Sequence, residues 1–78
     1  MKDFLEKLVS YIVTEGVSLK IEEELSEGLI IYKILVPEEE IGKIIGKEGK
    51  VISAIRTLCR IKAAKEQKRV LIKVDRIQ

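Results

Sequence analysis

The chain has 78 residues, enough for one small domain, which we expect to span residues 1–78. One cysteine and no histidine exclude an internal disulfide and a zinc site of the usual Cys/His type. No apolar run reaches the roughly 18 residues of a membrane span. We therefore expect a cytoplasmic protein that has no metal, no cofactor and no contact with membranes.

Charge is divided along the chain. Residues 1–40 hold ten acidic and four basic side chains, whereas residues 41–78 hold eleven basic and three acidic ones. The net charge of +2 therefore hides a basic half, as expected for a partner that is a polyanion. The alternative is a solvated surface on which the two halves mix.

The first elements are a helix and a hairpin. Helical spacing of the apolar residues Phe4, Leu5, Leu8, Val9 and Ile12 predicts a helix capped by Asp3 and ended by Gly16. Residues 17–25 alternate as a half-buried strand, with Val17, Leu19 and Ile21 on one side. A turn at 26–28 then leads into a more apolar strand over 29–36, so the two strands form an antiparallel hairpin.

Two helices and a strand follow. Pro37 and the acidic run 38–40 start a helix that breaks at Gly46. A second helix begins near Gly49 or Lys50 and runs to about Glu66, and residues 69–76 form the last strand. The order is α-β-β-α-α-β, an α+β fold. Strand 29–36 crosses to strand 69–76 through two helices, which predicts a parallel pair, a three-stranded mixed sheet and three helices on one face.

Three apolar residues of strand 29–36 are left on the other face of this sheet. Leu29, Ile31 and Leu35 alternate with the core residues of the strand. An exposed apolar patch often marks an association surface, which suggests a homodimer or another protein partner. The alternative is that the edges of the first helix cover them.

The segment Gly46-Lys47-Glu48-Gly49 is the candidate binding loop. Glycines allow a tight turn between two helices and let a phosphodiester approach the main chain. The second helix begins there, and its free N–H groups favour an anion. Lys43, Lys47 and Lys50 can all reach phosphates.

Apolar side chains lie beside this loop in both helices. Ile41, Ile45 and Ile52 are expected to floor a narrow aliphatic groove for unpaired bases, with phosphates along the loop. Arg56 is a candidate to extend the phosphate track, and Arg60 to face solvent. The alternative is that these arginines pair with carboxylates of residues 22–27. Duplex RNA does not fit such a groove, so the pattern indicates single-stranded RNA.

Other interpretations of the loop compete. Gly46 can be a helix C-cap, and the lysines can be an ordinary solvated face. A nucleotide-binding P-loop has different glycine spacing and a Ser or Thr where Glu48 stands. The RNA interpretation is favoured by the combination of an apolar helix, the Gly-x-x-Gly loop and a second apolar helix, all within one βααβ unit.

Residues 45–52, with sequence IGKEGKVI, resemble the signature of KH domains. The element order resembles their bacterial, type II arrangement. The whole chain is similar to the small single-KH proteins of the KhpA family, through residues 36–38, 41–43, the loop, 54–57, 63–66 and 68–70.

The resemblance implies non-catalytic binding of messenger or small regulatory RNA, in post-transcriptional regulation and as an RNA chaperone. It also implies a link to cell elongation and a homodimer or a heterodimer with a larger KhpB-type protein. Loop residues 46–49 would clamp about four nucleotides. Acidic Glu48 departs from the basic or small residue of many KH domains and indicates modest affinity.

An enzyme has little support, because the sequence offers no histidine, no paired carboxylates in an apolar setting and no activated serine. A small-molecule substrate is not expected. Cys59 is expected to be a buried core thiol. The rival to RNA binding is a protein-interaction module with weak or lost RNA binding.

Overall fold

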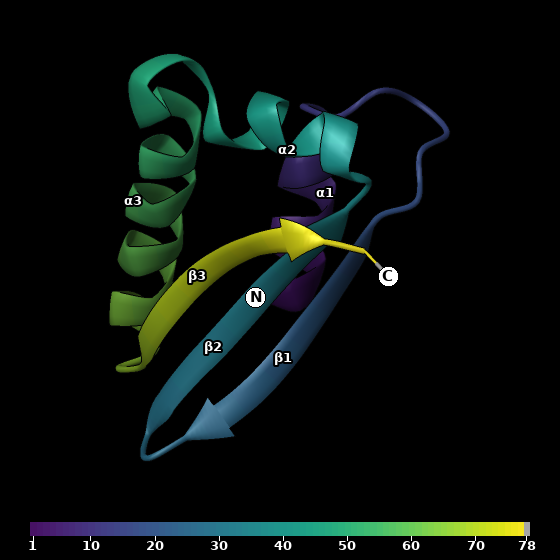
Figure 1. Ribbon diagram of the computed structural model, residues 1–78. Helices are drawn as coiled ribbons and strands as arrows, with labels where there is room; N and C mark the ends of the chain where they lie inside the picture. Colours follow the sequence, from purple (N-terminus) through teal and green to yellow (C-terminus); the bar gives the residue numbers. More distant parts are fainter. Residues whose placement is uncertain (78) are drawn as a thin grey trace.

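The computed structural model describes residues 1–77. The elements are α1 (Lys2–Ser10), β1 (Lys20–Ser26), β2 (Leu29–Val36), α2 (Glu38–Ile45), the single turn η1 (Lys47–Gly49), α3 (Lys50–Lys65) and β3 (Arg69–Arg76) (Figure 1). The predicted order and α+β class are confirmed. Within the described residues no helix combines the length and the apolarity that crossing a bilayer requires.

The sheet has the order β1-β2-β3. β1 and β2 are antiparallel, and β2 and β3 are parallel, so the predicted mixed sheet is confirmed. Glu27 and Gly28 connect the hairpin, with φ angles of 50° and 79°. Two positive φ angles in succession are the pattern of a type I′ turn, whose twist matches that of the flanking strands.

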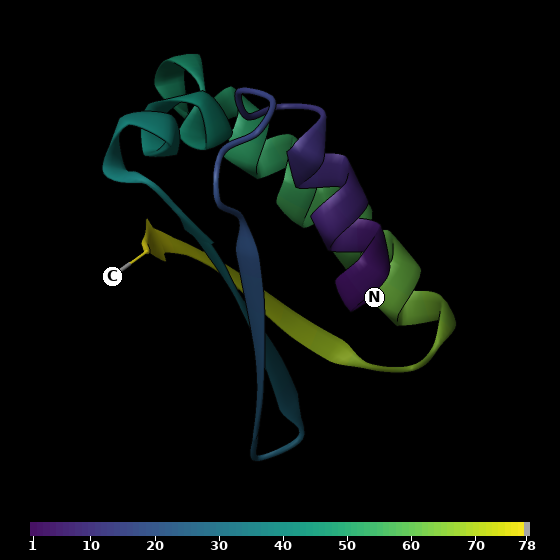
Figure 2. The same ribbon diagram turned by 90° about the vertical axis from the view of Figure 1, so that its right-hand side faces the viewer.

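The helices cover one face of the sheet, as predicted, and Figure 2 shows α1 and α3 side by side on that face. Side chains from all three α-helices and from all three strands meet in one core. Its fully buried members are Leu5, Val9, Ile34, Val36, Ile44, Ile55 and Cys59. The prediction for Cys59 is therefore confirmed, and burial raises the pKa of its thiol.

Two predictions about the first third of the chain are wrong. The first helix ends at Ser10, well before Gly16, and its N-cap is Met1 with Asp3 in the first turn. The first strand begins at Lys20 and not at residue 17. Val17 and Leu19 are half-buried, so their alternation reflects packing of a connecting segment that has no strand partner in β2.

The open face of the sheet carries the apolar residues singled out above. Leu29, Ile31 and Leu35 are half-buried and alternate with buried Tyr32, Ile34 and Val36. Because α1 packs with Ile34 on the opposite side, the alternative that its edges cover these residues is wrong. Leu71 of β3 pairs with Ile31 and is 37% exposed, which extends the patch onto β3.

Candidate nucleic-acid interface

The loop between α2 and α3 is built by two hydrogen bonds. The Gly46 N–H donates to the Gly42 carbonyl at 2.8 Å and ends α2, and the Gly49 N–H donates to the Gly46 carbonyl at 3.1 Å. Gly46 and Gly49 both have positive φ, 76° and 75°, a conformation that suits glycine. The chain therefore reverses within four residues, and α3 starts immediately after the turn.

Gly46 is needed for a second reason. A Cβ atom placed on it would approach Val51 Cγ2 to 2.3 Å and the Val51 backbone nitrogen to 2.9 Å. The loop is thus packed directly against the first turn of α3. A Cβ atom placed on Gly49 would have no atom within 4 Å. The space beside Gly49 is therefore open, and only its backbone conformation favours glycine.

Glu48 has a conformation that the sequence analysis missed. Its φ of 57° and ψ of 25° place it in the left-handed region, which non-glycine residues adopt at a cost. The hairpin carries the same pair, Glu27 followed by Gly28, with the same signs of φ. Glu15 also precedes a glycine in a turn but has no positive φ, so a glutamate before a glycine does not by itself predict this conformation.

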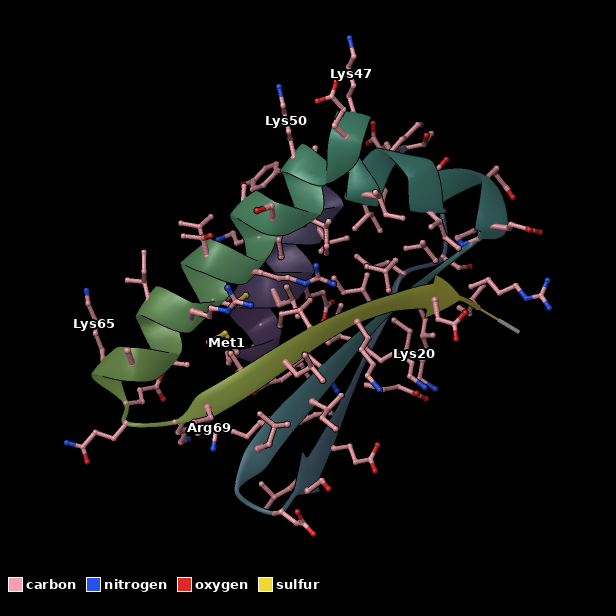
Figure 3. All side chains as sticks on the ribbon, turned by 60° about the vertical axis from the view of Figure 1, so that its left-hand side comes forward. Met1, Lys20, Lys47, Lys50, Lys65 and Arg69 are labelled. Carbon is pink, nitrogen blue, oxygen red and sulfur yellow. The ribbon has the colours of Figure 1, made fainter. Side chains whose placement is uncertain are left out.

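The lysines of the loop point away from the protein. Figure 3 shows Lys47 and Lys50 extending into solvent from the same end of the molecule. Neither forms an ion pair within the described residues. In the part of the chain that the structure describes, no side chain caps the first turn of α3. The Lys50 N–H donates to the Lys47 carbonyl, and the other N–H groups of that turn and the helix dipole reinforce the positive charge of both lysines.

Lys43, by contrast, is engaged within the protein. Its ammonium lies 3.4 Å from Glu40 Oε2 and also donates to Thr14 Oγ1. The Glu40 carboxylate accepts a hydrogen bond from the Thr14 backbone N–H at 2.7 Å and one from its hydroxyl at 3.0 Å. Sequence reasoning assigned Glu40 to the start of a helix and did not find this cluster, in which Thr14 is 26 residues from Glu40 and 29 from Lys43.

Among the described residues, Glu40 is the one charged residue that is buried, with only 5% of its surface exposed. The Thr14 backbone hydrogen bond, more than any other contact, lowers the pKa of Glu40, and Lys43 adds to that effect. The carboxylate therefore stays ionised and fixes the α1–β1 connection on α2.

The predicted aliphatic groove is only partly open. Ile45 is 40% exposed and Ile41 is half-buried, so both can offer surface beside the loop. Ile52 is 6% exposed and belongs to the core. It supports the loop from below and offers little surface to a base.

Arg56 and Arg60 differ in their surroundings. Arg56 is half-buried, and its guanidinium donates to the Ile72 carbonyl of β3 at 3.4 Å. It therefore spans the gap from α3 to β3, beside the surface where bases are expected. Arg60 is exposed.

A family model described as "KhpA/KhpB, KH domain" matches residues 2–74. The chain belongs to the KhpA/KhpB family of KH domains. The match includes the loop, both flanking helices and most of β3.

Individual KhpA proteins are similar over nearly their whole length. The "RNA-binding protein KhpA" of Clostridium perfringens is 35% identical over 74 residues, which are 95% of this chain and 99% of that protein. The protein of the same name from Chlamydia pneumoniae is 39% identical, over 95% of each chain. That of Thermotoga maritima is 36% identical over 76 residues, 97% of this chain and 100% of the relative.

Proposed function

We propose that this protein binds single-stranded RNA without catalysing a reaction, and that residues 46–49 form the phosphate-binding loop. The observation that carries the proposal is the loop itself. Gly46 cannot carry a side chain beside Val51. Lys47 and Lys50, which form no ion pair among residues 1–77, project from the N-terminus of α3. The names of the KhpA relatives support RNA as the ligand.

Each part of the loop has a role in this proposal. Lys47 contacts a phosphate, Lys50 and the α3 N–H groups attract the next, and Ile41 and Ile45 support bases beside them. Lys43 contributes positive potential while it stays bound to Glu40. Arg56 lies at the base side of the groove rather than on the phosphate track. A role in post-transcriptional regulation follows from binding short unpaired stretches of transcripts.

The test is fluorescence anisotropy with a labelled, mixed-sequence single-stranded RNA. The double variant Lys47→Asp, Glu48→Asp is compared with the wild type, and circular dichroism checks that both fold. Lys65→Asp is the matched control, because it changes the charge by the same amount at the far end of α3 (Figure 3). We expect the wild type and the control to bind and the loop variant to lose binding.

Salt dependence gives an independent measure. If about four phosphates are neutralised, a plot of log K against log salt has a slope of about −3 for a single strand. Equal binding by wild type and loop variant would place the RNA contacts elsewhere. If the wild type does not bind RNA at all, a protein-interaction module becomes the better-supported function.

That second candidate rests on exposed apolar residues of α3. Leu58 and Ile61 are 45% and 54% exposed on the face of α3 that points away from the core. Leu58 also lines a hollow of about 570 Å³ that extends along Ser53, Ala54 and Thr57 to Glu48, Gly49 and Lys50 at the start of α3. A second copy of this chain or the KH domain of a KhpB-type protein is the proposed occupant.

Ile61→Lys tests this interaction, since it places a charge beside exposed Leu58 on α3 and leaves the core residues unchanged. Light scattering at micromolar concentration is expected to show a dimer for wild type and a monomer for the variant. Leu71→Lys is the matched change on the open face of the sheet. If only Leu71→Lys dissociates the dimer, the sheet patch with Leu29, Ile31 and Leu35 is the interface.

A further inference from the structure

The central strand β2 has the composition of a strand that is covered on both faces. Its sequence, LIIYKILV, is apolar or aromatic except for Lys33, whereas a strand with one solvated face alternates apolar and polar residues. Figure 2 shows α1 and α3 on one side of the sheet, and no helix or strand among residues 1–77 packs on the other. The fold therefore leaves one face of an apolar strand uncovered.

The side chains of this open face form rows across the sheet. In β1 and β3 they alternate with buried Ile21 and Ile72. Read from β1 through β2 to β3, the rows are Lys20, Leu35 and Asp75; Glu22, Lys33 and Lys73; Glu24, Ile31 and Leu71; and Ser26, Leu29 and Arg69. Four basic and three acidic residues share the face, so its net charge is close to zero and it does not repel a second copy of itself.

A second copy fits this face with its charges matched. When two copies face each other across a two-fold axis that runs along β2, the β1 edge of each lies over the β3 edge of the other. Glu22 then meets the partner's Lys73, Lys20 meets the partner's Asp75, and the apolar residues of β2 meet at the axis. With the axis across the strands, β1 would lie over β1 and acidic residues over acidic ones. Charge therefore selects the first arrangement.

The area of the face limits the strength of such a contact. Strands of this length, about 4.8 Å apart, make a face about 26 Å long and about 14 Å wide, roughly 370 Å². A stable complex buries roughly 800 Å² on each partner. Leu35 lines a hollow of about 300 Å³ on this face, with Lys20, Glu22 and Asp75 among its other lining residues, and this hollow gives the partner's Leu35 a recess. The expected contact is weak, and the charges at its edges orient it.

We propose that the open face of the sheet is a weak self-association surface, on which two copies pack face to face with β1 over β3. Lys33, near the axis, lies between Glu22 of its own chain, its partner in the sheet, and Glu22 of the other copy. Lys20 is 3.6 Å from Glu22 within the chain, and exposed pairs of this kind exchange partners at little cost. The contact is separate from the one proposed for α3, so a chain that forms both contacts builds oligomers larger than a dimer.

The test is sedimentation equilibrium of the full chain from about 10 µM to about 1 mM. All variants carry Ile61→Lys, which removes the contact proposed for α3, and circular dichroism checks their folding. Glu22→Lys and Lys73→Glu are made singly and together. We expect the parent to dimerise at the upper end of the range and each single reversal to raise the Kd about fivefold to tenfold. The double variant should return to within about twofold of the parent, because the exchange restores opposite charges across the axis.

Lys65→Glu is the control, since it reverses an exposed charge at the far end of α3 and should leave the Kd unchanged. Raising the salt from about 0.05 M to about 0.5 M should weaken the parent dimer, because its ion pairs are exposed. Glu22 and Lys73 are both exposed, so their substitution leaves the core unchanged. Should either variant not fold, Ile31→Lys is the second one, because it places two like charges at the axis and should abolish the association.

The double variant decides the outcome. A parent that stays monomeric at the highest concentration would overturn the proposal, and so would equal association by parent and single variants. If both single reversals weaken the dimer and the double variant does not recover, the charges act in another arrangement and the proposal is wrong. None of these outcomes bears on RNA binding by the 46–49 loop, which the anisotropy experiment tests separately.

Discussion

The two glycines of the loop differ in what an added methyl group would meet. At Gly46 the positive φ combines with contact to Val51, whereas at Gly49 only the positive φ opposes a side chain. We expect Gly46→Ala to lower the free energy of unfolding by about 2–4 kcal/mol. Gly49→Ala should cost only about 1 kcal/mol.

Urea denaturation followed by circular dichroism measures both values. Equal losses for the two variants would mean that Val51 moves away readily and that the packing of the loop on α3 contributes little. Gly16→Ala, at φ 87° with open space around it, is the control for the effect of backbone conformation alone.

Glu48 and Glu27 share one backbone conformation in different surroundings, and they therefore form a matched pair. Asparagine adopts the left-handed region more readily than glutamate does. We expect both Glu48→Asn and Glu27→Asn to increase stability by about 0.5–1 kcal/mol. Only Glu48→Asn removes a negative charge beside Lys47, so only that variant should also bind RNA more tightly.

Thermal unfolding and RNA anisotropy on the two variants check this prediction. An unchanged RNA affinity for Glu48→Asn would mean that the carboxylate lies clear of the phosphates. A gain in affinity for Glu27→Asn, at the far hairpin, would point to an effect of net charge alone.

At the scale of elements, a single carboxylate connects the α1–β1 segment to α2. Because the pKa of Glu40 is lowered by its hydrogen bonds to Thr14 and by Lys43, its ionised form stabilises the folded state. The contribution is fully present above the pKa of the unfolded chain and is lost as the pH falls through the lower, folded pKa. The loss therefore occurs below about pH 4.5, the ordinary value for this group.

We expect Glu40→Gln to be less stable than wild type at pH 7 and to lose less of its stability between pH 5 and pH 3. Urea midpoints measured across this range check both statements, with exposed Glu39→Gln as the control on the same helix. Parallel pH profiles for wild type and Glu40→Gln would contradict the role given to the cluster.

Most element boundaries could be predicted because they depend on local chemistry. Pro37 starts α2, Gly46 ends it, and the alternation of β2 and β3 reports burial on one face of the sheet. The start of β1 could not be predicted in this way. Residues 17–19 alternate like a strand, but a strand is defined by its partner, and the pairing with β2 begins at Lys20.

In the candidate site, too, features set by local sequence could be predicted, and features set by contacts between distant residues could not. The turn at 46–49 and the two lysines in and beside it, Lys47 and Lys50, are visible in the eight consecutive residues 45–52. The engagement of Lys43 is not, because it depends on Thr14 and Glu40 meeting across 26 residues. Burial of Ile52 and the contact of Arg56 with Ile72 likewise depend on how α3 lies on the sheet, which helical periodicity alone does not fix.

For the whole molecule, the order of the strands places acidic and basic residues, which are separated along the sequence, on opposite edges of the sheet. Strand β1, with Glu22, Glu23 and Glu24, forms one edge of the sheet, and β3, with Arg69 and Lys73, forms the other. The basic edge lies on the side of α3, next to β3 in Figure 1. A polyanion is therefore drawn to the α3–β3 side and repelled from β1. Under the proposed function, this asymmetry would orient an RNA before it reached the loop.

The rate at which a thiol reagent labels Cys59 measures how often the core of the domain opens. The Cys59 thiol is fully buried between α3 and the sheet, and Cys59 is the one cysteine of the chain. A thiol reagent therefore reaches it only when the domain opens. For a small domain of ordinary stability, we expect native Cys59 to react at least about a thousandfold more slowly than in the unfolded chain.

The comparison needs an exposed thiol on the same helix. The double variant Thr57→Cys, Cys59→Ala provides one, because position 57 is exposed, and it should react at the rate of a free peptide. In rising urea the labelling of Cys59 should accelerate in step with global unfolding measured by circular dichroism. Rapid labelling in native buffer would instead mean that α3 separates from the sheet locally. The loop at its N-terminus would then be mounted on a mobile helix, and RNA binding would have to include the cost of ordering it.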